Sequence, residues 1–157
     1  MTKPTAFWDA SALVPLCIKE ATTDQVRLHL RRFAPVAWWA SVVEVHSAIS
    51  RLHREGALDI SERDGALARL NVLSKGWREI LPDDSLRNLA STLLDTYSLR
   101  AADSLQLAAA LTWCQQRPEH KTFVCGDKRL SETAKSAGFA VIGLSRPIAQ
   151  SKRTPIE

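Results

Sequence analysis

The sequence predicts an α/β domain built on a short, mainly parallel sheet. Short runs of apolar and β-branched residues, typical of buried strands, alternate along the 157-residue chain with longer segments of helical periodicity. Helices between successive strands are the connections that a parallel sheet requires. Apolar residues make up 45% of the chain and charged residues 24%, which is typical of a globular protein with a sizeable core.

The N-terminal half is expected to hold two strands and four helices. The strands, TAFWD at 5–9 and PVAWW at 35–39, are rich in apolar and aromatic residues. Pro15 lies near the first turn of its helix, where a missing backbone N–H does least harm. Ser41 and Glu44 have the spacing of a capping box, in which both side chains bond to the start of their own helix. The helices are expected over residues 11–20, 24–33, 41–54 and 61–73.

The C-terminal half continues this alternation. Strands are expected over residues 77–81, 122–126 and 139–144, and helices over residues 84–97, 101–114 and 127–137. Gly138 ends the last of these helices, as glycine commonly does. We expect residues 1–145 to form a single domain, and the polar residues 146–157, with two prolines, to form a flexible tail.

Composition narrows the class of protein. The net charge of +4 permits a polyanionic partner such as RNA without requiring one. Three cysteines without a CxxC spacing argue against a disulfide framework or a zinc site, and indicate a reducing, cytoplasmic compartment. The first residues lack the apolar core of a signal peptide, and no run approaches the roughly 20 apolar residues of a membrane span.

Four acidic residues are expected at one edge of the sheet. Asp9 and Asp127 adjoin the ends of predicted strands, and Glu44 and Asp103 lie in the first turns of helices. In open parallel sheets, ligands bind outside the carboxyl ends of the strands. Four carboxylates gathered there would repel one another unless a divalent cation joined them, and Mg²⁺ and Mn²⁺ prefer oxygen ligands. Such a site suits hydrolysis of a phosphodiester.

Each acid also has a purely local interpretation. Asp9 and Asp127 could cap the helices that follow them, and Glu44 could serve the capping box. Asp103 could pair with Arg100 or favour the helix dipole. Capping explains each acid singly, but not why Asp9, Glu44 and Asp103 all adjoin apolar sequence. Both interpretations stay open at this point.

Four blocks of the sequence resemble the signature blocks of PIN domains, most closely those of VapC-type toxins of bacterial toxin–antitoxin pairs. They span residues 7–142 in the family's order: FWDASALVPLCIKE, SVVEVHSAISRL, LRAADSLQLAAAL and FVCGDKRLSETAKSAGFAVI. The resemblance implies a three-layer α/β/α sandwich and an endoribonuclease that depends on Mg²⁺ or Mn²⁺. It also implies that the catalytic and metal-binding residues are Asp9, Glu44, Asp103 and Asp127. Ser11 would support them with its hydroxyl group.

The resemblance also implies partners: an RNA substrate, a small antitoxin that binds and blocks the nuclease, and a second copy of the chain in the many members that are homodimers. Lys128 and Arg129 follow an expected ligand and are candidates for holding RNA phosphates. Trp38 or Trp39 could stack a base, but successive strand residues point to opposite faces, so one of them belongs in the core. Other arginines could bind RNA or form solvated helix faces: Arg27, Arg31, Arg32, Arg51 and Arg54.

Two positions depart from the family pattern. Cys125 stands where many relatives have a hydroxyl residue, so the hydrogen bond that would support Asp127 is altered. Gln106 stands where many relatives have histidine. Two other classes of protein also place an aspartate after the first strand. Haloacid-dehalogenase-type phosphatases need an acid where Ser11 stands, and response-regulator receivers need a paired acid cluster and a lysine near the last strands. A further alternative is a non-catalytic RNA- or partner-binding module whose acids only cap helices.

Overall fold

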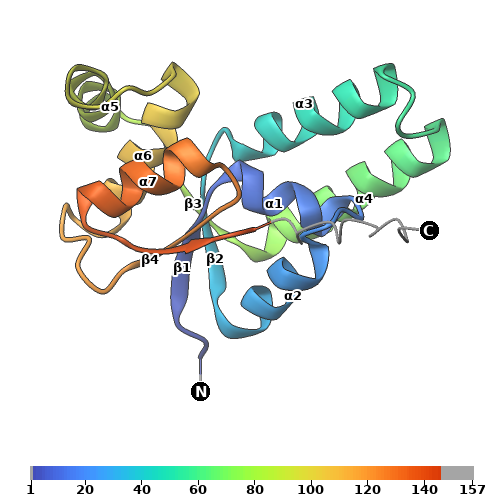
Figure 1. Cartoon of the computed structure of the whole chain (residues 1–157), viewed down its shortest axis with the longest axis horizontal. Helices are drawn as coiled ribbons and strands as arrows, with labels where there is room; N and C mark the ends of the chain where they lie inside the picture. Colours follow the sequence, from blue (N-terminus) through green and yellow to red (C-terminus); the bar gives the residue numbers. More distant parts are fainter. Residues whose placement is uncertain (1, 146–157) are drawn as a thin grey trace, which may run out of the picture.

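A five-stranded sheet lies between two layers of helices in the computed structural model, which describes residues 2–145 (Figure 1). All neighbouring strands are parallel, in the order β3-β2-β1-β4-β5. The strands are β1 (Thr5–Trp8), β2 (Ala34–Trp38), β3 (Arg78–Ile80), β4 (Thr122–Cys125) and β5 (Ala140–Gly143). The helices are α1 (Ala10–Cys17), α2 (Thr23–Arg32), α3 (Ser41–Arg54), α4 (Ile60–Gly76), α5 (Asp84–Thr96), α6 (Ala101–Trp113) and α7 (Lys128–Ala137). The predicted α/β/α sandwich with a short parallel sheet is confirmed.

β1 occupies the centre of the sheet, and the chain extends the sheet from it in two directions. β2 and β3 form one half, and β4 and β5 form the other, so the strand order switches between β1 and β4. Phe7 of β1 is in register with Val36 of β2 and Phe123 of β4. Asp9 follows β1 directly and Asp127 follows β4 by two residues, so both adjoin the switch point, where open parallel sheets bind ligands.

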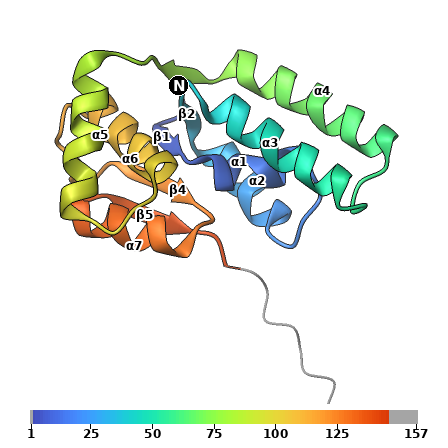
Figure 2. The ribbon, with the colours of Figure 1, turned by 90° about the horizontal axis from the view of Figure 1, so that it is seen from above.

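The side chains of β1 alternate between two hydrophobic cores, one on each face of the sheet. Phe7 belongs to the core formed with α5, α6 and α7, where it stacks on Phe123 with 5.4 Å between ring centroids. Ala6 and Trp8 belong to the core formed with α1, α3 and α4. Figure 2 shows these two groups of helices on opposite sides of the strands. Burial on both faces explains why β1 is a continuous apolar run, and it anchors the residue that follows.

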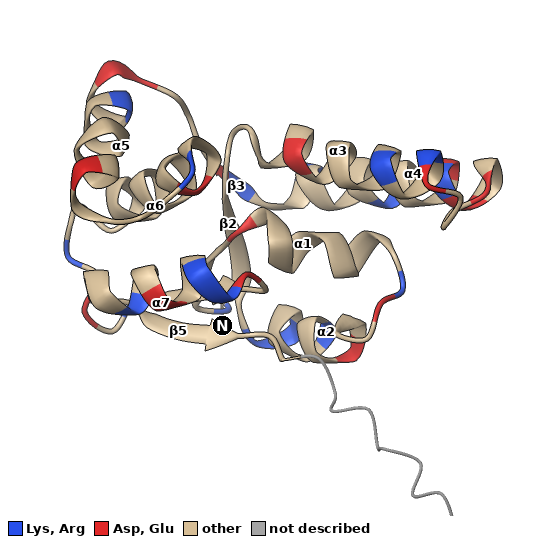
Figure 3. Ribbon diagram, turned by 45° about the horizontal axis from the view of Figure 1, so that its top comes forward, with Lys and Arg blue, Asp and Glu red and all other residues tan. Residues whose placement is uncertain are grey.

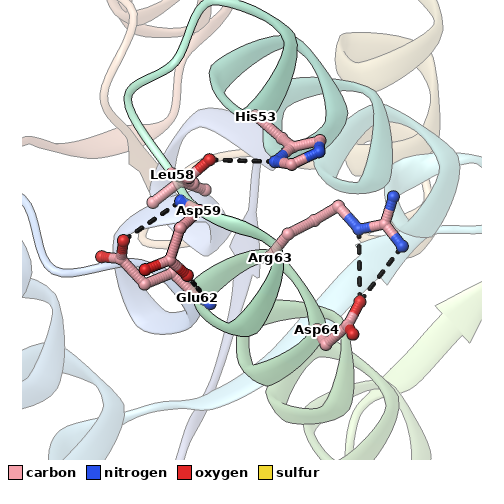
Figure 4. Close-up of polar contacts among 6 residues, drawn as sticks. All are labelled: His53, Leu58, Asp59, Glu62, Arg63 and Asp64. Carbon is pink, nitrogen blue, oxygen red and sulfur yellow. Dashed lines mark hydrogen bonds and ion pairs between the residues drawn. The ribbon is translucent and has the colours of Figure 1, made fainter.

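α4 begins at a capping box that the sequence analysis does not predict. Glu62 N donates to Asp59 Oδ1 at 2.7 Å, and Asp59 N donates to Glu62 Oε1 at 3.1 Å (Figure 4). The preceding turn is closed by a hydrogen bond of 2.9 Å between His53 Nδ1 and Leu58 O. These contacts join α3 to α4 and set where α4 starts.

α1 ends three residues before its predicted end at residue 20. The hydroxyl of Thr23 donates to Pro15 O at 2.9 Å and accepts from Glu20 N at 2.8 Å. These bonds satisfy groups that a longer helix would have used, so the chain turns after Cys17 toward α2. The other elements lie where the sequence predicts them, with ends that differ by a few residues.

Three further expectations concern a membrane span, the C-terminal tail and the cysteines. Within residues 2–145, no helix is long and apolar enough to cross a membrane. Residues 146–157, the predicted flexible tail, lie outside the described part of the chain. The three cysteines, Cys17, Cys114 and Cys125, are buried and unpaired.

Candidate functional site

Asp9 is a buried carboxylate at the carboxyl end of β1, only 4% exposed. Its backbone N–H donates to Val124 O at 3.0 Å, which ties it to β4. Its side chain caps α1 by accepting from Ser11 N at 3.1 Å, and it also accepts from the Ser11 hydroxyl. Burial raises the pKa of this carboxyl, and the hydrogen bonds from Ser11 oppose the rise.

Ser11 joins the start of α1 to the end of β4. Its hydroxyl donates to Asp9 and accepts from Gly126 N at 2.9 Å. A Cβ added to Gly126 would lie 3.0 Å from Ser11 O, so the two backbones approach closely because residue 126 is glycine. The thiol of Cys125 lies 3.7 Å from Asp9 Oδ2, and its sulfur accepts from Asp127 N at 3.4 Å. Cys125 therefore contacts two of the predicted site residues through weak hydrogen bonds.

Glu44 lies in the first turn of α3, but the capping box predicted for it is wrong. The N-cap is Ala40, which makes no side-chain cap bond, and Ser41 is the first helical residue. Ser41 Oγ and Glu44 Oε1 instead both accept from Gln106 Nε2 of α6, at 3.0 and 3.2 Å. Burial, followed by the charge of Asp9, raises the pKa of Glu44 to about 7, and the bond from Gln106 opposes this rise.

Asp103 lies in the first turn of α6, and Asp127 is the N-cap of α7. Burial and then the charge of Asp127 raise the pKa of Asp103, while a backbone hydrogen bond from Arg100 and then the charges of Arg100 and Arg129 oppose the rise. The ion pairs found within residues 2–145 do not include one between Arg100 and Asp103. Asp127 is exposed and caps α7 by accepting from Leu130 N at 2.9 Å, as one interpretation of the sequence predicts.

The structure brings the four predicted acids to one edge of the sheet. The charges of Asp103 and Asp127 raise the pKa of Asp9, and those of Asp9 and Asp103 raise the pKa of Glu44. Such mutual effects arise only between groups that lie near one another. In Figure 3, acidic segments (red) at the starts of α1, α3, α6 and α7 face the middle of the molecule. Two of the acids do cap helices, so capping and clustering occur together.

The donor set suits a hard divalent cation. All four side chains are carboxylates. Burial and then mutual repulsion raise the pKa values of Asp9, Glu44 and Asp103, and a bound cation would reverse the repulsion. Among the residues described, no three His, Cys, Asp or Glu side chains are arranged so that they could hold one ion together. Mg²⁺ is usually held by one or two carboxylates, with water and substrate oxygens completing its shell. The residues present therefore fit Mg²⁺ or Mn²⁺ in that mode rather than in a preformed protein cage.

The candidate RNA-binding residues differ in their distance from the acids. Lys128 and Arg129 are exposed in the first turn of α7, and Arg129 is close enough to affect the pKa of Asp103. Trp38 is 4% exposed and belongs to the core, whereas Trp39 is 52% exposed just after β2, which confirms that one of the two is buried. The other arginines lie on α2 and in the last turn of α3, the end opposite its acid: Arg27, Arg31, Arg32, Arg51 and Arg54.

The same fold occurs in several solved structures, one of them a toxin–antitoxin complex. VapBC2 from Rickettsia felis, bound to a DNA fragment from its promoter, matches with a TM-score of 0.62 and 9% identity, covering 90% of this chain and 99% of that one. FitAcB from Neisseria gonorrhoeae matches with a TM-score of 0.59 and 13% identity, covering 87% of this chain and 96% of that one. A toxin–antitoxin complex from Klebsiella pneumoniae matches with a TM-score of 0.58 and 13% identity, covering 81% of this chain and 91% of that one.

These likenesses define the class of fold. The chain has a PIN-like α/β/α fold, as its sequence blocks predict. No family model and no curated protein sequence matches the chain. At identities of 9 to 13%, the likeness establishes the architecture, and the activity has to be argued from the site.

Two residues of the site are not predicted by the sequence analysis. Gln106 is noted there only as a departure from a family pattern, and Gly126 is not singled out. The available indication was a polar side chain inside the apolar helix AADSLQLAAAL, because a buried amide requires hydrogen-bond partners. Nothing in the local sequence indicates which partners it finds on α3.

Proposed function

We propose that this protein is a divalent-metal-dependent endoribonuclease and the toxin component of a toxin–antitoxin pair. The observation that carries the proposal is the gathering of four carboxylates at the switch point of the sheet, three of them with pKa values raised by burial and by one another. Helix capping accounts for the positions of Asp9 and Asp127. It does not account for Glu44, whose carboxylate bonds to Gln106 of another helix. It also does not explain why Asp103, which takes a backbone hydrogen bond from Arg100 at the start of α6, lies close enough to Asp127 for that charge to raise its pKa.

The proposed chemistry is hydrolysis of an RNA phosphodiester. Asp9, Glu44 and Asp103 would hold one or two Mg²⁺ or Mn²⁺ ions, each bound by one or two of these carboxylates, and Asp127 would complete the site or orient the attacking water. The bound cation would supply a lowered pKa for water and charge neutralisation at the phosphate. The hydrogen bonds from Ser11 hold the Asp9 carboxylate in one orientation, so that it is ready to bind without rearrangement.

RNA would be held beside the acids by exposed groups of the same edge. Lys128 and Arg129 would contact phosphates, which gives salt-dependent binding with little sequence information. The exposed indole of Trp39 would stack on an unpaired base. The proposal also includes a small antitoxin as protein partner, a cytoplasmic site of action and a homodimer. The toxin–antitoxin complex that shares this fold supports the antitoxin partner.

Cleavage of structured RNA by the purified protein, with Mg²⁺ or Mn²⁺ and then with EDTA, tests this proposal. Asp9→Asn and Asp103→Asn should abolish cleavage and leave circular dichroism and thermal unfolding close to those of the parent, because asparagine keeps the shape and can still cap a helix. Asp95→Asn, an exposed acid of α5, is the matched control and should cut RNA like the parent. Parental cleavage by both site variants would refute the proposed site.

The alternative of a non-catalytic module is favoured by one observation, the capping of α1 and α7 by Asp9 and Asp127. Such a module would bind RNA or a protein partner without cutting RNA in any divalent cation. Its affinity would also be unchanged in the two site variants. The same RNA, followed by a gel-shift assay as well as a cleavage assay, separates the two functions.

A further inference from the structure

Gln106 is a buried polar residue in an otherwise apolar helix. It is 1% exposed, and the residues that follow it in α6, from Leu107 to Leu111, are all buried hydrophobics. It lies three residues after Asp103, so both residues lie on the same side of α6. The only hydrogen bonds of its side chain within residues 2–145 lead out of its own helix to α3.

The two hydrogen bonds of Gln106 connect the two faces of the sheet. α6 packs in the core with α5 and α7, whereas α3 packs in the core with α1 and α4. Gln106 Nε2 donates to Ser41 Oγ at 3.0 Å and to Glu44 Oε1 at 3.2 Å, across 62 residues of sequence in the second case. A single amide group therefore fixes the carboxylate of one helix relative to the helix that carries Asp103.

Stability of the fold does not explain this arrangement. Gln106 Oε1 is buried and has no hydrogen-bond partner among the described residues, which destabilises a protein relative to an apolar side chain of the same size. Turning the amide over would place its oxygen against Glu44 Oε1, one acceptor against another. The observed orientation gives both Ser41 Oγ and Glu44 Oε1 a donor and leaves the Gln106 carbonyl without a partner among the described residues.

We propose that Gln106 is a positioning residue, which holds the Glu44 carboxylate at the spacing from Asp103 needed for the two to bind one divalent cation. Ser41 is the second anchor of the same amide, through its hydrogen bond of 3.0 Å from Gln106 Nε2. This inference rests on the proposed metal-dependent function. Gln106 is neutral and is not one of the four acids, but it sets the geometry of the acid cluster. Residues that hold metal ligands in place commonly affect metal affinity as strongly as some ligands do.

The test compares metal affinity with fold stability in three variants. Gln106→Met removes the amide and keeps the volume, Ser41→Ala removes one anchor, and Leu107→Ala damages the same helix without touching Glu44. Mn²⁺ affinity is measured by calorimetric titration, and the unfolding temperature is measured in EDTA. We expect Gln106→Met to bind Mn²⁺ about 10- to 100-fold more weakly than the parent. Its unfolding temperature should fall by less than that of Leu107→Ala, because the fold loses one buried hydrogen bond to Ser41 and no packing volume. Ser41→Ala should show a smaller loss of affinity, and Leu107→Ala a lower unfolding temperature with unchanged affinity.

The other possible outcomes would overturn either the role of Gln106 or the proposed function. Parental Mn²⁺ affinity in Gln106→Met would overturn the positioning role and leave the proposed metal site intact. Equal losses of affinity in Gln106→Met and Leu107→Ala would show that the residue acts only through the fold. A parent protein that binds no Mn²⁺ would refute the proposed function itself. If Gln106→Met does not fold, Ser41→Ala decides, and parental affinity in that variant overturns the role of the anchored amide.

Discussion

Replacing Glu44 with glutamine should stabilise the cation-free protein at alkaline pH. Burial and the charge of Asp9 raise the pKa of Glu44 from its ordinary value of 4.5 to about 7. The folded state therefore holds this proton more tightly than the unfolded state does. The stability that the proton contributes is complete below pH 4.5 and is lost as the pH rises through about 7. Glu44→Gln carries no charge at any pH and can still accept a hydrogen bond from Gln106.

The size of the effect follows from the same values. A pKa of about 7 in place of 4.5 corresponds to about 3 kcal/mol of unfolding free energy, at about 1.4 kcal/mol for each tenfold change in proton affinity. Solvent screening at a partly buried carboxyl reduces the expectation to about 2 kcal/mol. Glu44→Gln should therefore exceed the parent in stability by about 2 kcal/mol near pH 8, and by nothing near pH 4.

Urea unfolding in EDTA at these two pH values measures the difference. The matched control is Glu55→Gln, an exposed glutamate directly after α3, which should show no comparable gain. Mg²⁺ should stabilise the parent more than Glu44→Gln, because only the parent keeps the carboxylate. The reasoning would be refuted if Glu44→Gln were no more stable than the parent near pH 8. It would also be refuted if the gain in unfolding free energy were the same near pH 4 as near pH 8.

Three further predictions concern the surroundings of the acids. Gly126→Ala would place a Cβ 3.0 Å from Ser11 O, and it should lower the unfolding free energy by about 1–3 kcal/mol and reduce RNA cleavage; parental stability would contradict this close approach. Asp127→Asn should keep the cap of α7, whereas Asp127→Ala should lose about 1 kcal/mol in urea unfolding; equal stabilities would show that the cap contributes nothing. Trp39→Ala should weaken single-stranded RNA binding by about 1–3 kcal/mol in fluorescence titrations, whereas Leu81→Ala, which removes an exposed apolar side chain that is not aromatic, should not; equal losses would instead indicate a general apolar contact.

The elements of this fold are predictable from sequence because each is locally consistent. Buried strands such as β4 are short apolar runs between polar turns, and α3 and α6 are long segments with strong helical preference. The early end of α1 is not predictable in this way. It depends on the Thr23 hydroxyl, which bonds to two groups that a longer helix would have used.

The candidate site shows the same division between local and distant determinants. The positions of Asp9 and Asp127 follow from the strands that they adjoin, and their capping roles follow from the helices that they begin. The spacing of Ser41 and Glu44 is that of a local capping box, but their partner is Gln106, more than sixty residues away. A spacing of three residues puts two side chains on one side of a helix, and only the tertiary structure decides what they face there.

The central claim is that the acids at the carboxyl edge of the sheet form one cation site. A crystal of the parent protein soaked in Mn²⁺, with an anomalous difference map at the manganese edge, tests this most directly. We expect a manganese peak in contact with Asp9, Glu44 or Asp103. This peak should be absent from crystals of Asp9→Asn. A peak bound elsewhere, or an ordered acid cluster without a peak, would contradict the account.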